Sequence, residues 1–133
     1  MATVKLLGDE DLSAEAKAVF DDIRATRDSD FVNNFWRALA HDPALLKRTW
    51  ESIKQVMAPG ALDPLTKEMI YIAISASNGC SYCVHSHTAS ARAKGMSEAM
   101  FMELMGVVGM ANETNAIVNA LGVPVDEAFE AGK

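Results

Sequence analysis

The chain lacks an excess of basic residues, has only two cysteines and contains no long apolar run. Its 12 lysines and arginines stand against 18 aspartates and glutamates, which gives a formal net charge of −6. Without a basic stripe that could neutralise phosphates, nucleic acid is not an expected partner. The longest apolar run, at residues 69–76, is far shorter than the roughly 20 residues that cross a bilayer, so we expect no membrane association.

Residues 1–10 contain no long apolar stretch behind a basic segment, so the sequence predicts no secretory signal and favours a cytoplasmic protein. A reducing compartment keeps cysteines reduced at rest. There, a single CxxC pair such as Cys80 and Cys83 is more often redox-active or metal-binding than a structural disulfide. Both cysteines are therefore candidate functional residues.

Strict two-residue alternation is also missing, whereas helix start and stop signals recur. Ser13, Asp42 and Asp63 are capping side chains, and the last two precede a proline at a first helical position. The sequence predicts an all-α fold of six or so helices in a single domain over residues 1–133. The expected helices cover residues 13–26, 31–40, 43–57, 64–77, 80–94, 98–111 and 113–121.

The CxxC pair is expected at the start of a helix, because Gly79 ends the preceding one. At about 100° per residue, Cys80, Cys83 and His87 fall within an arc of roughly 60°, while His85 points about 140° away from Cys80. A helix N-terminus stabilises a thiolate, and residues three apart lie within disulfide range. The spacing thus indicates a thiol pair that can open and close without refolding.

Two further residues complete the candidate site. His87, one turn beyond Cys83, can accept the thiol proton and return it to a leaving oxygen as a general base. Glu68 lies on the preceding, largely apolar helix, where a carboxylate needs a partner. The thiol pair and His87 could provide that partner, which would create a proton relay.

Other interpretations of these residues stay open. The cysteines could be two buried thiols without a role, or Cys80, Cys83, His87 and Glu68 could bind zinc. Three ligands on one helical face make a poor tetrahedron, and structural zinc usually joins separated segments. A redox sensor without turnover is a further alternative.

The pattern of Glu68, eleven residues, Cys80, two residues, Cys83, three residues and His87 resembles the alkylhydroperoxidase D-like branch of the carboxymuconolactone decarboxylase family. Residues 34–43 also resemble the family's pocket-forming helix and its exit, and the resemblance spans roughly residues 31–110. The short chain resembles the small peroxidase-related members. A lyase acting on a lactone acid, as the family name suggests, has no need for two thiols.

The resemblance implies an all-helical protein assembled into trimers or hexamers, which reduces hydroperoxides with a dithiol and without metal, haem or another cofactor. It implies that Cys83 attacks the peroxide and that Cys80 resolves the resulting sulfenic acid as a disulfide. A reductant, in related proteins a lipoyl-type dithiol carrier, then restores both thiols. The high apolar content, 50% of the residues, also favours a homo-oligomer.

One position departs from the family pattern. The best-known members carry histidine immediately before the second cysteine, whereas this chain has Tyr82. A phenol with a pKa near 10 cannot act as a base at neutral pH, although it can donate a hydrogen bond. Tyr82 and His41 are candidate residues of the substrate pocket.

Overall fold

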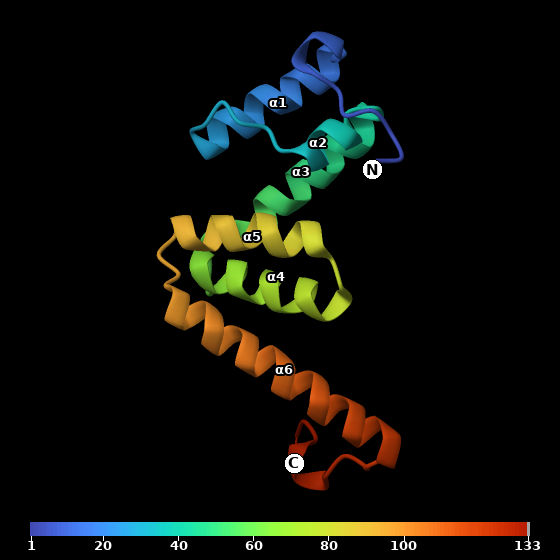
Figure 1. The fold of residues 1–133 in the computed structure, drawn as a ribbon, viewed down its shortest axis with the longest axis vertical. Helices are drawn as coiled ribbons and strands as arrows, with labels where there is room; N and C mark the ends of the chain where they lie inside the picture. The colour runs from blue at the N-terminus through green and yellow to red at the C-terminus, as the bar shows by residue number, and fades with distance from the viewer. Residues whose placement is uncertain (133) are drawn as a thin grey trace. The chain divides into compact units, whose positions relative to one another are not determined.

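The computed structural model describes residues 1–132, and in that range it contains six α-helices, two short 3-10 helices and no strand (Figure 1). The predicted all-α fold is therefore confirmed. The α-helices are α1 (Ala14–Arg27), α2 (Asn34–Leu39), α3 (Pro43–Met57), α4 (Pro64–Asn78), α5 (Ser81–Ala93) and α6 (Glu98–Leu121). The 3-10 helices are Asp9–Asp11 and Glu127–Phe129.

The chain divides into two compact units, Met1–Ala58 and Pro59–Lys133. The first unit contains α1 to α3, and the second contains α4 to α6. Each unit has its own cluster of buried apolar residues. The single domain expected over residues 1–133 stays a prediction.

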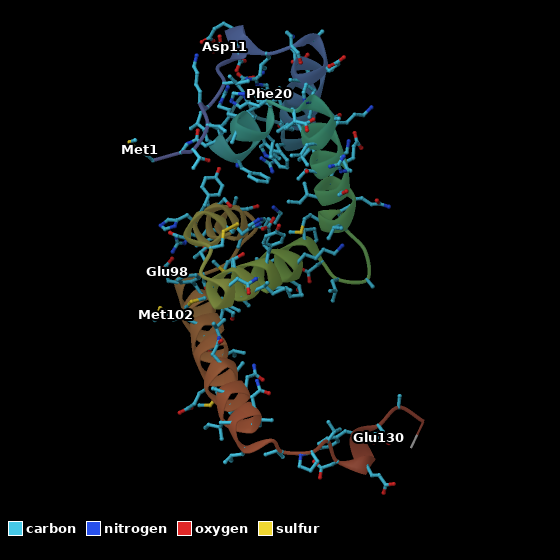
Figure 2. The ribbon with its side chains drawn as sticks, turned by 90° about the vertical axis from the view of Figure 1, so that its right-hand side faces the viewer. Met1, Asp11, Phe20, Glu98, Met102 and Glu130 are labelled. Atoms are coloured by element: carbon cyan, nitrogen blue, oxygen red, sulfur yellow. A yellow bond between two sulfur atoms is a disulfide. The ribbon has the colours of Figure 1, made fainter. Side chains whose placement is uncertain are left out.

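The first unit encloses an aromatic core, and Figure 2 shows Phe20 among its side chains. The Trp36 and Trp50 rings meet edge to face, with their centroids 5.5 Å apart. Asp22 accepts hydrogen bonds from Trp50 Nε1 and Lys54 Nζ, both at 2.7 Å, so the polar edge of the Trp50 ring also has a partner. The buried cluster comprises Ala16, Val19, Phe20, Ile23, Val32, Trp36, Ala40, Leu46 and Trp50.

The second unit is built on α4 and α5, which lie side by side in Figure 1 and are joined at Gly79. Gly79 has a φ of 73°, a left-handed conformation that glycine adopts without steric cost. The helix α6 contacts α4 as well. The apolar cluster of this unit consists of Ile72, Ala91 and Met96, with the partly buried side chains Leu65, Met69, Met100, Phe101, Leu104 and Met105 packed against it.

Most of the predicted helix starts are confirmed by cap geometry. The side chains of Ser13, Asp42, Asp63 and Ser97 each accept a hydrogen bond from a backbone N–H in the first turn of the helix that follows. The β-branched stretch at residues 69–76 is helical, as its Asp-Pro start predicts. The start of α5 is also as expected, because Cys80 is its N-cap.

Two expected helix boundaries were wrong. The helix expected over residues 31–40 begins only at Asn34, because side chains satisfy the preceding backbone: Ser29 Oγ accepts from the Phe31 N–H, and the Val32 carbonyl accepts from Arg37 Nε. The break expected near residue 112 is absent, and α6 is continuous. Asn112 donates a hydrogen bond to the Val108 carbonyl of its own helix, which leaves the helical backbone intact.

Across residues 1–132, none of the helices combines the length and the apolar character that crossing a bilayer requires.

Candidate functional site

The turn between α4 and α5 positions the two cysteines. Cys80 follows Gly79 directly, and its N–H donates to the Ser75 carbonyl at 2.9 Å, which ties the N-cap of α5 to the last turn of α4. Cys83 lies in the first turn of α5, with its Cα atom 5.4 Å from that of Cys80. The two sulfur atoms are paired as a disulfide. The sequence prediction that this CxxC pair can form an intramolecular bond at a helix start therefore agrees with the structure.

A backbone donor in the first turn of α5 points at a cysteine sulfur. The Cys83 N–H donates to Cys80 Sγ at 3.3 Å, so Cys80 caps the helix with its own side chain. Unpaired amide donors and the positive end of the helix dipole favour an anion at this place. A thiolate at Cys80 would be stabilised by both effects in the reduced protein.

Glu68, in the second turn of α4, is a buried charged residue of this unit. Its side chain is only 7% exposed. One carboxylate oxygen accepts from His87 Nδ1 at 2.7 Å, and the other accepts from Ser90 Oγ at 2.9 Å and Lys94 Nζ at 3.3 Å. The buried carboxylate predicted to need a partner thus has three.

These partners decide the ionisation of Glu68. Burial by itself would raise the pKa of its carboxyl group, because it penalises the charged form. The hydrogen bonds from His87 and Ser90, together with the electrostatic effects of His87 and Lys94, outweigh burial and hold the pKa below its ordinary value of 4.5. Glu68 is therefore an anion at neutral pH.

The His87 ring is held from two sides. Its Nδ1 faces the Glu68 carboxylate, and the Tyr71 ring stacks on it, with centroids 3.7 Å apart and an interplanar angle of 23°. Because a carboxylate accepts, Nδ1 carries the proton, and the neutral ring keeps the lone pair on Nε2. Cys83 lies four residues earlier on the same helix, and residues at this spacing share a helical face. The arrangement leaves His87 able to take a proton on Nε2.

Three residues of this cluster are not part of the predicted motif: Tyr71, Ser90 and Lys94. The signal for two of them is present in the sequence, because Ser90 and Lys94 continue the spacing of Cys83 and His87 along one face of α5. Tyr71 follows Glu68 by three residues on α4. The helical face of Cys83 and His87, continued along α5 by two turns, contains both hydrogen-bond donors, Ser90 and Lys94. The stacking of Tyr71, in contrast, depends on how α4 packs against α5.

The remaining histidines and Tyr82 occupy other places. His41 belongs to the first unit, where its Nε2 lies 2.6 Å from the Lys5 carbonyl oxygen. Tyr82 is 43% exposed on the first turn of α5. His85 is exposed, and its Nδ1 lies 2.8 Å from the Ser81 carbonyl oxygen. The role of His41 and Tyr82 in a substrate pocket stays a prediction.

A shallow hollow of about 240 Å³ opens beside the turn. It is lined by Ser75, Ala76, Gly79, Cys80, Ser81, Val84 and His85. Helical geometry separates His85 from Cys80 by about 140°, yet both line this hollow. The arithmetic does not apply to this pair because Cys80 is the N-cap, and its backbone, with φ −86° and ψ 89°, is not helical.

The zinc alternative finds no support in the site geometry. Among residues 1–132, no group of three or more His, Cys, Asp and Glu side chains is arranged to hold a metal ion. Both oxygens of Glu68 are engaged by protein donors instead.

The chain is similar to proteins of one known family. Residues 43–126 match the carboxymuconolactone decarboxylase family. The chain is similar to the alkyl hydroperoxide reductase AhpD of Solibacter usitatus (strain Ellin6076), with 34% identity over 71 residues, which are 53% of this chain and 40% of that protein. It is also similar to the uncharacterized protein 4 in the cox locus of Paracoccus denitrificans, with 37% identity over 54 residues, which are 41% of this chain and 49% of that protein. Each match spans less than half of the relative's length.

A solved structure matches over almost the whole chain. This chain is similar to the crystal structure of the alkylhydroperoxidase AhpD core from Rhodospirillum rubrum ATCC 11170. The two sequences are 66% identical, the TM-score is 0.94, and the match covers 97% of each chain. Since the family match also runs from the start of α3 to beyond the end of α6, the chain belongs to the carboxymuconolactone decarboxylase family, in its alkylhydroperoxidase D-like branch.

Proposed function

We propose that the protein is a thiol peroxidase, or more broadly a dithiol–disulfide oxidoreductase, that reduces hydroperoxides with Cys80 and Cys83. The observation that carries this proposal is the hydrogen bond between the buried Glu68 carboxylate and His87, because His87 lies one helical turn beyond Cys83. A buried carboxylate that orients an imidazole next to a thiol is the arrangement that activates a nucleophile. The similarity to alkylhydroperoxidase proteins supports the same reaction class.

In the proposed oxidation, Cys83 is the attacking residue. His87 Nε2 takes the proton of the Cys83 thiol, and the thiolate attacks the terminal oxygen of the hydroperoxide. The O–O bond breaks, the alkoxide takes the proton from His87 and leaves as an alcohol, and Cys83 becomes a sulfenic acid. Glu68 is a positioning residue here, because it holds Nδ1–H of His87 and stabilises the imidazolium that forms.

Cys80 completes the oxidative half of the cycle. Its thiolate, stabilised at the start of α5, attacks the sulfenic sulfur of Cys83; the disulfide forms and hydroxide leaves, which a proton converts to water. An unidentified dithiol, which the family resemblance suggests is of the lipoyl type, then reduces the bond. A reducing cytoplasm would supply such a dithiol.

The proposal is tested by following both thiols through one oxidation. Fully reduced protein is mixed with one equivalent of cumene hydroperoxide, and thiol titration and intact mass spectrometry are recorded over time. We expect two free thiols to become none and the mass to fall by that of two hydrogen atoms. Thiols that remain free while peroxide persists would contradict the proposed function.

We further propose that the protein forms a homo-oligomer, a trimer or hexamer. The support is α6, in which no residue is buried within the chain. Met102, which lies near the start of α6 in Figure 2, and several other apolar residues of this helix are exposed: Val107, Met110, Ile117, Val118 and Leu121. An exposed apolar surface of this kind is typical of an interface. Light scattering would contradict this proposal if it gave the mass of a single chain, 14.3 kDa.

A further inference from the structure

The two cysteines face different surroundings, and only one of them lines the hollow. Cys83 lies on the helical face that continues to His87, where the peroxide reaction is proposed. Cys80 lines the hollow beside the turn, whereas Cys83 is not among the residues that line it. In the second half of the reaction, a reductant must reach one of the disulfide sulfurs. The hollow gives it a route to Cys80 that is separate from the helical face of His87.

The hollow is lined mostly by small residues. Ser75, Ala76, Gly79 and Ser81 carry no side chain large enough to cover Cys80. At Gly79, even an added Cβ atom would meet nothing within 4 Å, so this side of the turn is open. Thiol–disulfide exchange requires the attacking sulfur to reach the disulfide sulfur directly, so access to each sulfur is one factor that decides which of them is attacked.

His85 supplies a titratable group on the rim of the same hollow. Its Nδ1 lies 2.8 Å from the Ser81 carbonyl oxygen, and a carbonyl can only accept, so Nδ1 carries the proton. The neutral ring therefore has its lone pair on Nε2, away from the backbone. His85 makes no contribution to the Glu68–His87 cluster, and the proposed oxidation does not use it.

We propose that the hollow is the docking site of the dithiol reductant, that the reductant attacks Cys80 rather than Cys83, and that His85 is the general base for the attacking thiol. This inference rests on the proposed function, because the reductant completes the proposed catalytic cycle. The exchange step itself depends only on the disulfide and can be tested without peroxide. The occupant is a small dithiol, because the reacting sulfur sits in a hollow of about 240 Å³ rather than on an extended surface.

Two exchange steps balance the reaction. His85 Nε2 takes the proton of the first thiol, the resulting thiolate forms a bond to Cys80 Sγ, and the Cys80–Cys83 bond breaks with Cys83 leaving as a thiolate. The second thiol of the reductant, losing its own proton, attacks the reductant's sulfur in the mixed disulfide and releases Cys80 as a thiolate. Two electrons pass from the dithiol to the protein, and the two protons return to the cysteines or to solvent.

The first experiment measures the base. Protein is oxidised with diamide, so that no peroxide reaction is needed, and its reduction is followed by stopped flow with dithiothreitol and separately with a phosphine. A phosphine carries no S–H proton, so it needs no base. We expect His85→Ala to lower the dithiol rate constant about 10- to 100-fold at pH 7 and to leave the phosphine rate within about twofold. Added imidazole should restore the dithiol rate in proportion to its concentration.

Two matched variants complete this experiment. Ala89→Gln, at an exposed position of the same helix, should change neither rate. Ala76→Leu, which fills the hollow, should slow both reductants. Equal slowing of dithiol and phosphine by His85→Ala would show a steric effect and overturn the role as base, and unchanged rates would overturn it as well.

The second experiment identifies the attacked sulfur. Oxidised protein is mixed briefly with the monothiol cysteamine, quenched with acid and alkylated, and fragment masses locate both modifications. The mixed disulfide is expected on Cys80 and the alkyl group on Cys83; the reverse would overturn the proposed approach. Because neither experiment uses peroxide, failure of the peroxidase function would appear only in the separate oxidation assay.

Discussion

The interiors of the two units differ in what they bury. In the first unit the buried cluster is apolar, and its ion pairs, such as Asp22 with Lys54, lie at the partly exposed edge. In the second unit a carboxylate, Glu68, is buried among four side chains that contact it or its histidine partner. Buried ion pairs seldom add to stability compared with apolar packing. This difference is consistent with the proposal that the second interior serves a chemical reaction, while the first serves stability.

The largest effect expected from this comparison is the separation of activity from folding at Cys83. Cys83→Ser should lower peroxide consumption by at least about 10³-fold, since it removes the nucleophile, while the unfolding transition of the reduced protein stays close to that of the wild type. Cys80→Ser should instead trap a sulfenic acid, which dimedone labelling and mass spectrometry detect. The opposite labelling pattern would exchange the two roles.

A core substitution in the first unit should give the complementary result. Leu46 is fully buried, so Leu46→Ala should lower the free energy of unfolding by about 2–5 kcal/mol, measured by denaturant titration. The rate of peroxide reaction per folded molecule should stay within about twofold. Leu62→Ala, at an exposed position, is the matched control and should change stability by less than about 0.5 kcal/mol. A loss of activity larger than the loss of folded protein would contradict the assignment of the first unit to stability alone.

The smallest expected effect concerns the pH dependence of stability at Glu68. Because its folded pKa lies below 4.5, the ionised group favours the folded state fully above pH 4.5, and this contribution is lost as pH falls through the folded pKa. Glu68→Gln should therefore be less stable than the wild type at pH 7, by about 1–3 kcal/mol. The difference in stability between the wild type and this variant should become smaller in acid, as measured by thermal unfolding between pH 7 and pH 3.

Two readouts sharpen the Glu68 prediction. The same variant should lower the peroxide rate about 100-fold, since His87 loses the anion that orients it. Glu103→Gln replaces an exposed carboxylate of the same unit and should change neither stability nor rate. A stability gap that is independent of pH would show that Glu68 is not ionised in the folded state, contrary to its contacts.

Local signals in the sequence were sufficient for much of the fold and the site. Asp-Pro pairs, capping serines and Gly79 each act within one turn of the chain, so the starts of α3, α4, α5 and α6 were predictable. The contact between Glu68 and His87 was anticipated from burial and motif spacing. The helix starts depend on neighbouring residues alone, whereas the Glu68–His87 contact also requires α4 to pack against α5.

Most features that escaped prediction depend on contacts between distant residues. The backbone before α2 is held by side chains such as Arg37, whose guanidinium also donates to the Leu7 carbonyl oxygen, and no local pattern reveals this. The stacking of Tyr71 on His87 requires the packing of α4 against α5. The placement of Cys80 and His85 at one hollow escaped prediction for a local reason, because a helical projection does not apply to the non-helical N-cap backbone of Cys80.

The hydrogen bonds of Glu68 with His87, Ser90 and Lys94, together with the cysteine pair, fall within one short stretch of chain, from Glu68 to Lys94. A candidate site that is this local can be inherited as a unit. Mutations elsewhere can alter the length, the termini and the surface of a descendant while the hairpin of α4 and α5 retains its chemistry.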